Sequence, residues 1–158
     1  MLSLARVSGL SMAPTLRPAD VLLTVRAGRA APLRGDVVVV RRSGGLVVKR
    51  VVALAGDIVE LEAGRLFVDG RSVDGRPRVR GALTQRWQVP PGQVFLAGDN
   101  AAASDDSRVW PDPFVPLADV EARVVARLPP LRLPRLPRLA PARGVSPRRR
   151  DVAARPAA

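Results

Sequence analysis

The chain contains a single lysine, Lys49, among 26 lysine and arginine residues. Arginine keeps its proton at any accessible pH, whereas a buried lysine can lose its proton and act as a base. The sequence has no histidine and no cysteine, which excludes Ser/His/Asp and Cys/His catalytic groups and the usual zinc ligands. If the protein performs nucleophilic chemistry, serine with lysine is the remaining pair, and Lys49 is the candidate general base.

Lys49 lies in the segment LVVKRVVALAGD, residues 46–57. In a strand, side-chain alternation places Lys49 on one face with Val47 and Val51, and Arg50 on the other. Flanking valines reduce the hydration of the amine, which disfavours its charged form and lowers its pKa. The alternative is an edge-strand lysine whose amine reaches water, for which no such shift is expected.

A candidate nucleophile occurs in VSGLSMAPTL, residues 7–16, where Ser11 stands between Gly9 and Pro14. This segment must turn tightly before the next apolar run at 21–25. A tight turn can expose a hydroxyl together with free backbone N–H groups, and a serine nucleophile with an oxyanion hole needs both. Taken alone, a serine beside glycine and proline is equally an ordinary turn residue.

A third polar stretch, GDNAAASDDSR at residues 98–108, follows an apolar run. If it is extended, alternation lets the side chains of Ser104, Asp106 and Arg108 project together. An ion pair between Asp106 and Arg108 would then fix the loop, and Ser104 would be free to orient a neighbouring amine. By itself the stretch is also compatible with an ordinary polar loop that begins with a turn at 99–100.

The elements that must position these groups are strands. Short runs rich in valine and leucine, divided by glycine-containing turns, predict an all-β, mainly antiparallel fold. The expected strands are residues 21–25, 36–41, 46–54, 58–61, 65–68, 93–97 and 120–128. The last also carries proline and aspartate near its start, which is compatible with a helix, but its Val-rich alternation favours a strand.

Composition separates a globular body from a basic tail. The 158 residues suit one domain, and a hydrophobic content of 47% with only 3% aromatics predicts a core of valine, leucine and alanine. Residues 129–158 hold eight arginines against one aspartate and are rich in proline, which predicts a disordered tail after a domain at 1–128. No apolar run is long enough to span a bilayer, so a soluble or peripheral protein is expected.

Together the three stretches resemble the type I signal peptidase family, serine/lysine peptidases that remove leader peptides. SGLSMAPT resembles the box that holds the nucleophile, at Ser11, and VKRVVALAGD the box that holds the base, at Lys49 followed by Arg50. GDNAAASDDSR resembles a later box of the family, and GDVVVV at 35–40 the remaining one. The resemblance implies a β catalytic core at 1–128 with a small β insertion at 58–93.

The resemblance also implies a mechanism. Neutral Lys49 would take the proton of Ser11, which attacks the scissile carbonyl to give an acyl-enzyme. Ser104 would hydrogen-bond the lysine, with Asp106 and Arg108 as its support. No cofactor and no metal are implied. The implied substrates are preproteins with small residues at the first and third positions before the cut.

The oxyanion hole would rest on backbone donors. The backbone N–H of Ser11 is the implied donor, and Gly9 occupies the position where some family members carry an additional serine hydroxyl.

The chain differs from the family in the segment ahead of the serine box, which bears on where the protein is located. Family members normally carry a membrane-spanning helix ahead of the serine box, and ten residues precede Ser11 here. The resemblance implies a membrane-associated enzyme on the outer face of the cytoplasmic membrane, to which the arginine-rich tail could add attraction for anionic lipids.

Three alternatives remain open at this stage. A specialised maturation peptidase of the same superfamily would act on a soluble precursor, and a self-cleaving repressor-like protease would be cytoplasmic. A basic module that binds nucleic acid or lipid is the non-enzyme alternative. The scarcity of aromatic side chains argues against dedicated nucleic-acid binding, because single-strand binders stack bases on aromatic rings.

Overall fold

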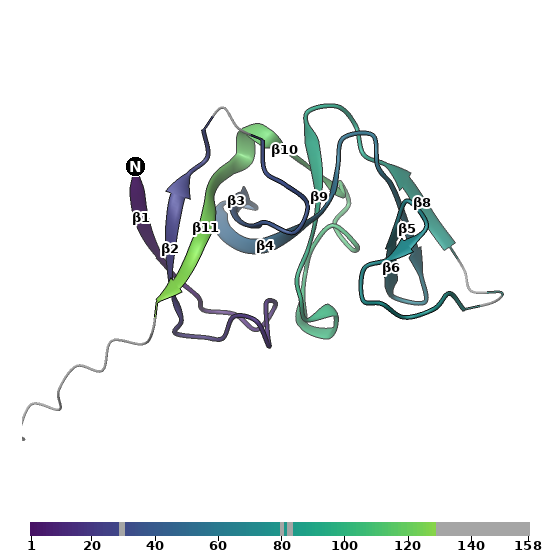
Figure 1. Ribbon diagram of the computed structural model, residues 1–158, viewed down its shortest axis with the longest axis horizontal. Coiled ribbons are helices and arrows are strands. Elements are labelled where there is room, and N and C mark those ends of the chain that lie inside the picture. The colour runs from purple at the N-terminus through teal and green to yellow at the C-terminus, as the bar shows by residue number, and fades with distance from the viewer. Residues whose placement is uncertain (29–30, 80, 82–83, 129–158) are drawn as a thin grey trace, which may run out of the picture.

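A computed structural model describes residues 1–28, 31–79, 81 and 84–128 (Figure 1). The predicted disordered tail at 129–158 lies outside these residues. The elements are β1 (Leu2–Arg6), β2 (Val21–Arg26), β3 (Val37–Arg42), β4 (Gly45–Leu54), β5 (Ile58–Glu62), β6 (Arg65–Val68), β7 (Arg71–Ser72), β8 (Thr84–Gln88), β9 (Gln93–Ala97), η1 (Ala101–Ala103), β10 (Phe114–Pro116), η2 (Leu117–Asp119) and β11 (Val120–Leu128). The predicted all-β, mainly antiparallel fold class is confirmed.

The strands form two sheets that lie side by side in Figure 1. The larger sheet has the order β1-β2-β11-β3-β4-β9-β10, and the smaller sheet has the order β7-β6-β5-β8. The smaller sheet is built from residues 58–88, inside the stretch expected to form an insertion. The domain limits 1–128 and 58–93 remain predictions.

The sequence of β11 was compatible with a helix or a strand, and its pairing with neighbouring strands explains why it is a strand. It lies between β2 and β3 and pairs with both in antiparallel register. Its backbone N–H and C=O groups can therefore hydrogen-bond to a strand on each side. In a helix, the same groups would have to bond within the segment itself. Of the two residues that suggested a helix, Asp119 lies in the short η2 turn before the strand, and Pro116 ends β10 and precedes that turn. The expectation of a strand is confirmed.

Four strands were not expected from the sequence: β1, β7, β8 and β10. β1 and β10 are the two edges of the large sheet, and β7 and β8 are the two edges of the small one. Edge strands expose much of their surface, so their sequences lack the apolar runs that identify buried strands. These strands are recognised only by their pairing with neighbouring strands in the structure.

The core is built largely from valine, leucine and alanine, as predicted. At the junction of the two sheets, Val59 and Leu66 from the small sheet pack with Val52 and Phe95 from the large one. Phe95 also contacts the ring of Trp87, with ring centroids 5.6 Å apart. Burying such side chains stabilises the fold by about 1.5–3 kcal/mol each, so the small sheet is held firmly against the sheet that carries Lys49.

Candidate active site

The segment that carries Ser11 is a loop between β1 and β2, closed at its base and anchored by apolar side chains. The N–H of Val7 donates to the carbonyl of Asp20 at 2.9 Å. Met12, which is 1% exposed, packs with Leu16 in an apolar cluster. Burial of Met12 turns its neighbour Ser11 towards the surface of the loop, where Ser11 is half-buried.

Lys49 occupies a central position in the large sheet. β4 lies between β3 and β9, and Lys49 pairs with Val38 across the β3–β4 ladder. The side chain is 4% exposed, and its Nζ donates a hydrogen bond to the Ser104 Oγ at 3.1 Å. The predicted burial is confirmed, and the alternative of an edge-strand lysine that reaches water is wrong.

The surroundings of Lys49 favour its neutral form. Burial is the largest influence and lowers the pKa of Lys49 below its ordinary value of 10.5. The negative charges of Asp106 and Asp105 oppose this effect, and the positive charge of Arg108 adds to it. The net result is a pKa of Lys49 that is lowered, which makes an unprotonated amine available at lower pH than on a free lysine.

Ser104, Asp106 and Arg108 form one connected network, as expected, but the extended backbone on which that expectation rested is wrong, because the chain turns at residues 106–109. The Ser104 hydroxyl donates to Oδ2 of Asp106 at 2.5 Å, and Arg108 donates through Nε to Oδ1 at 2.8 Å and through Nη2 to Oδ2 at 2.5 Å. The backbone N–H of Gly98 also donates to Asp106, at 2.8 Å. The expected ion pair between Asp106 and Arg108 is therefore confirmed.

Asp106 is fully buried, so its charge depends on these donors. Desolvation by itself would raise the pKa of Asp106 most strongly. Hydrogen bonds from Arg108, from the Gly98 N–H and from Ser104 outweigh that effect, and the pKa of Asp106 is lowered below 3.8. Asp106 is therefore a fixed carboxylate that holds the Ser104 hydroxyl in one orientation.

We expect Asp106→Asn to destabilise the fold by about 3–5 kcal/mol at pH 7, because it leaves the Arg108 guanidinium, 10% exposed, without its carboxylate. The pKa of Asp106 is lower in the folded chain, so its contribution is present above pH 3.8 and is lost as pH falls through the folded pKa. Urea unfolding of both proteins across this range measures the effect.

The control for that measurement is Glu121→Gln, which breaks the exposed pair between Arg41 and Glu121. Exposed pairs contribute about 1 kcal/mol or less, so this variant should unfold close to wild type. Equal stability of Asp106→Asn and Glu121→Gln at pH 7 would contradict a supporting role for the buried pair.

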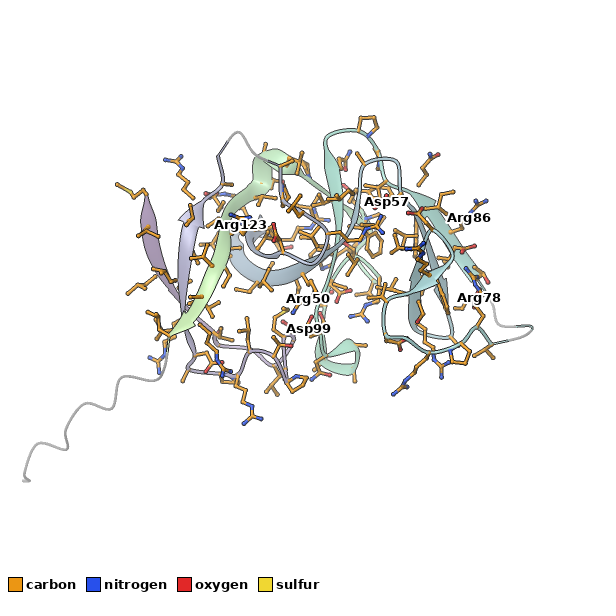
Figure 2. The ribbon with its side chains drawn as sticks, viewed as in Figure 1. Arg50, Asp57, Arg78, Arg86, Asp99 and Arg123 are labelled. Carbon is orange, nitrogen blue, oxygen red and sulfur yellow. The ribbon has the colours of Figure 1, made fainter. Side chains whose placement is uncertain are left out.

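Arg50 points away from the Lys49 network and pairs with Asp99, which the sequence indicated only as a turn residue. Its Nε and Nη2 donate to the two Asp99 oxygens at 2.8 and 2.6 Å, and its Nη1 donates to the Gly35 carbonyl. Burial would raise the pKa of Asp99, but Arg50 and the neighbouring Thr15 lower it below its ordinary value. Asp99 therefore ties the Ser11 loop to β4, and Figure 2 shows Arg50 and Asp99 next to each other.

Gly98 and Asn100 bring the serine loop against the Ser104 network, and the sequence did not reveal this. The Asn100 N–H donates to the Ser11 carbonyl at 2.9 Å. A Cβ atom on Gly98 would lie 2.2 Å from the Ser104 Oγ and 2.4 Å from the Ser11 carbonyl oxygen. The φ of Gly98 is not in the left-handed region, so lack of space, rather than backbone conformation, requires glycine here.

Among the described residues, the Ser11 hydroxyl and Gly9 make no hydrogen bond to the network around Lys49. Within the described part of the chain, no hydrogen bond connects the Ser11 hydroxyl with Lys49. The two are brought together through Gly98, which contacts Ser11 and Ser104 at once. Gly9 is exposed and has no atom within 4 Å of the place where a Cβ would lie. It offers no side-chain donor and leaves the approach to Ser11 open.

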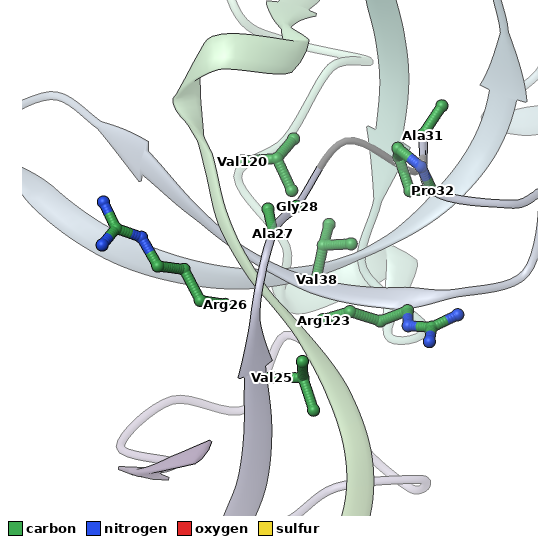
Figure 3. Close-up of a pocket in the computed structure, with 9 residues that line it drawn as sticks. All are labelled: Val25, Arg26, Ala27, Gly28, Ala31, Pro32, Val38, Val120 and Arg123. Atoms are coloured by element: carbon green, nitrogen blue, oxygen red, sulfur yellow. The ribbon is translucent and has the colours of Figure 1, made fainter. Parts of the chain in front are cut away.

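A pocket of about 280 Å³ lies elsewhere, between β2, β11 and the segment after β2 (Figure 3). Val25, Val38 and Val120 give it an apolar lining, and Arg123 reaches its rim. None of the predicted site residues lines it. Helices of the length and apolarity needed to cross a membrane are absent from residues 1–28, 31–79, 81 and 84–128.

The part of the chain that contains this site also matches known proteins. Residues 1–128 match the family model described as signal peptidase, peptidase S26. The chain is 33% identical to signal peptidase I of Pseudomonas fluorescens over 54% of its own length and 42% of the relative. It is 31% identical to signal peptidase I of Bacillus caldolyticus over 80% of its own length and 79% of the relative.

A solved signal peptidase I from Enterococcus faecalis matches with a TM-score of 0.49 and 29% identity, covering 62% of this chain and 100% of the solved one. The chain spans less than half the length of the Pseudomonas fluorescens relative. The family model, by contrast, extends through all four sequence boxes, from β1 to the end of β11. On the strength of that match, the chain belongs to the signal peptidase family, peptidase S26.

Proposed function

We propose that this chain is a signal peptidase I, a serine endopeptidase in which Ser11 is the nucleophile and Lys49 the general base. One observation carries the proposal: the Lys49 amine is buried, and it hydrogen-bonds a neutral hydroxyl rather than a carboxylate. A lysine paired with a carboxylate would keep its proton, whereas this one is held where burial favours the neutral amine. Family membership supports the same activity.

The hydrogen bonds around Ser104 leave the basic site of Lys49 free. The Ser104 hydroxyl uses its proton on Asp106, so it can only accept from Lys49. A neutral amine has two N–H groups and one lone pair. If one N–H is used on Ser104, the lone pair stays available for the proton of Ser11. Ser104 therefore acts as a positioning residue for the base.

The reaction then follows the serine–lysine scheme. As Lys49 takes its proton, Ser11 Oγ attacks the scissile carbonyl, and the protonated Lys49 donates to the leaving amine. Water, deprotonated by Lys49, hydrolyses the resulting acyl-enzyme. The Ser11 backbone N–H makes no hydrogen bond within the described residues, so it is available to the oxyanion.

Two ion pairs act as the frame of this site. Arg108 and Asp106 hold Ser104, while Arg50 and Asp99 hold the loop that contacts Ser11. Such supports keep the reacting groups in place without touching the substrate.

The proposed substrates are exported preproteins with small residues before the cut, processed at the outer face of the cytoplasmic membrane. The side chain of Leu10, next to Ser11, is 57% exposed, which supports an active site that faces an apolar environment. Attraction of the tail to anionic lipids remains a proposal for residues outside the described ones.

Cleavage of a leader-bearing preprotein in detergent tests the proposal. We expect the purified chain to cut after a small residue, and Ser11→Ala to lower kcat/KM by at least about 10³-fold, because no other group replaces the nucleophile. Mass spectrometry of the products identifies the cut.

Ser8→Ala is the matched control, since Ser8 is an exposed serine in the same loop. It should cut at the wild-type rate. Equal cleavage by Ser11→Ala and wild type would refute the assignment of the nucleophile.

A further inference from the structure

A second pocket, of about 390 Å³, borders the proposed active site. It lies between the Ser11 loop, the loop that follows β9, and the small sheet. Thr15 lines it from the first, Gly98 and Ala101 from the second, and Arg65 and Asp74 from the third. The residues that the small sheet contributes to this pocket take no part in the proposed reaction.

The pocket begins where the reaction would take place. Gly98 forms part of its lining and also touches the carbonyl of Ser11. Thr15, four positions after Ser11, forms another part. A peptide bound across Ser11 can therefore enter the pocket with residues close to the cut.

The polar lining indicates which part of the substrate enters. Beside apolar side chains such as Val52, Leu66 and Val73, three arginines and two aspartates face the pocket: Arg50, Arg65, Arg108, Asp74 and Asp99. A leader peptide carries an apolar region and small residues before the cut, and these offer no partner to the charged groups of the lining. The beginning of a mature exported protein is the polar side of the cleavage site, and it suits this lining.

Arg65 is the arginine of this lining that forms no ion pair with a described residue. Arg50 is paired with Asp99 and Arg108 with Asp106. Arg65 donates to the backbone carbonyl of Pro77 at 3.1 Å, and among the described residues no carboxylate lies within ion-pair distance of it.

Asp74, the other charged residue on the small-sheet side of the pocket, attracts Arg65 electrostatically but takes its hydrogen bonds from other groups. Asp74 accepts from the Ser72 hydroxyl at 2.7 Å and from the Arg76 N–H at 3.1 Å. Arg65 thus keeps guanidinium donors for an incoming carboxylate, which guanidinium binds in a planar, two-point geometry.

We propose that this pocket receives the first residues of the mature protein after the cut, and that Arg65 binds an acidic side chain there. The inference rests on the proposed peptidase function and adds to it a preference for the chain beyond the scissile bond. Arg65 is a specificity-determining residue in this assignment, and the small sheet is part of the substrate site.

A series of preproteins tests this, with Glu, Gln or Lys placed singly at the second, third or fourth residue after the cut. At low salt we expect wild type to prefer Glu over Gln by about fivefold in kcat/KM at one of these positions, and Lys to be cut more slowly than Gln. Arg65→Gln should remove the preference, and Arg65→Glu should reverse it. High salt should weaken it in wild type, because the pair is partly exposed.

Arg86→Gln is the matched control, because Arg86 is an exposed arginine of β8 in the same sheet and does not line the pocket. It should keep the wild-type preference. The preference is read in each variant as the ratio of kcat/KM for the Glu substrate to kcat/KM for the Gln substrate, so that a change in overall activity cancels.

Two outcomes would overturn the inference while leaving the peptidase function intact. One is equal cleavage of the Glu, Gln and Lys substrates by wild type at all three positions. The other is a preference for Glu that persists in Arg65→Gln. Failure of wild type to cut any member of the series would instead contradict the proposed function, and this inference with it.

Discussion

Lys49→Arg is expected to lower kcat/KM for preprotein cleavage by about 10³-fold, because it keeps the positive charge and removes the only base that the site offers. Lys49→Met, which keeps the length and apolar character of the side chain, should lose as much activity with less strain in the buried site. Cleavage rates of the three proteins, compared at equal folded concentration, measure the loss.

Arg41→Lys provides the control, since it adds a lysine on the exposed side of β3. It should leave wild-type cleavage unchanged, and it should not restore activity when combined with Lys49→Arg. Cleavage by Lys49→Arg at the wild-type rate would show that Lys49 is not the base.

The pH dependence of wild type gives an independent reading of Lys49. The neutral amine is the active form, so kcat/KM should rise with pH through the pKa of Lys49. Burial lowers that pKa, Asp106 and Asp105 oppose the change, and Arg108 reinforces it, so the midpoint should lie below 10.5. A midpoint at or above 10.5 would mean that the amine is not desolvated in the working enzyme.

Gly98→Ala is expected to lower kcat by about 10²-fold, although it adds a single methyl group. Its Cβ would lie 2.2 Å from the Ser104 Oγ and 2.4 Å from the Ser11 carbonyl oxygen, both far inside van der Waals contact. Ser104 can rotate away only by giving up its bond to Lys49, and the Ser11 carbonyl can move only with its loop. Displacement of reacting groups by about 1 Å can cost 10²-fold in rate.

Gly28→Ala separates this effect from a general penalty for replacing glycine. No atom of the described residues lies within 4 Å of a Cβ built on Gly28, and its φ lies outside the left-handed region. It should retain full activity and stability. If Gly98→Ala kept wild-type kcat, the close contact between the serine loop and Ser104 could not be essential for catalysis.

Local pattern was sufficient for much of this protein. The unique lysine within a run of valines predicted a buried amine, and the structure places Lys49 in a central strand. The polar stretch at 104–108 predicted the network of Ser104, Asp106 and Arg108, although the chain turns at 106–109 instead of running extended as expected. Apolar runs between turns predicted the all-β fold for the same local reason.

Contacts between distant segments were not readable in this way. Arg50 and Asp99 were each visible in the sequence, but their pairing across 49 positions depends on β4 lying beside β9. The role of Gly98 depends on a third segment, the Ser11 loop, meeting Ser104 at one point. In the sequence, a loop glycine that is required because no side chain fits looks the same as a loop glycine that only allows the chain to turn.

The sequence by itself determined which groups can take part in the chemistry. They are one lysine, a serine in a tight turn, and an aspartate and an arginine, able to form an ion pair, near a second serine. Tertiary structure decided how they meet, including the bond from Lys49 to Ser104 across 55 positions and the pocket lined by the small sheet. The physical reason is that periodicity reports the burial of each strand, whereas the order of strands in a sheet comes from packing over the whole chain.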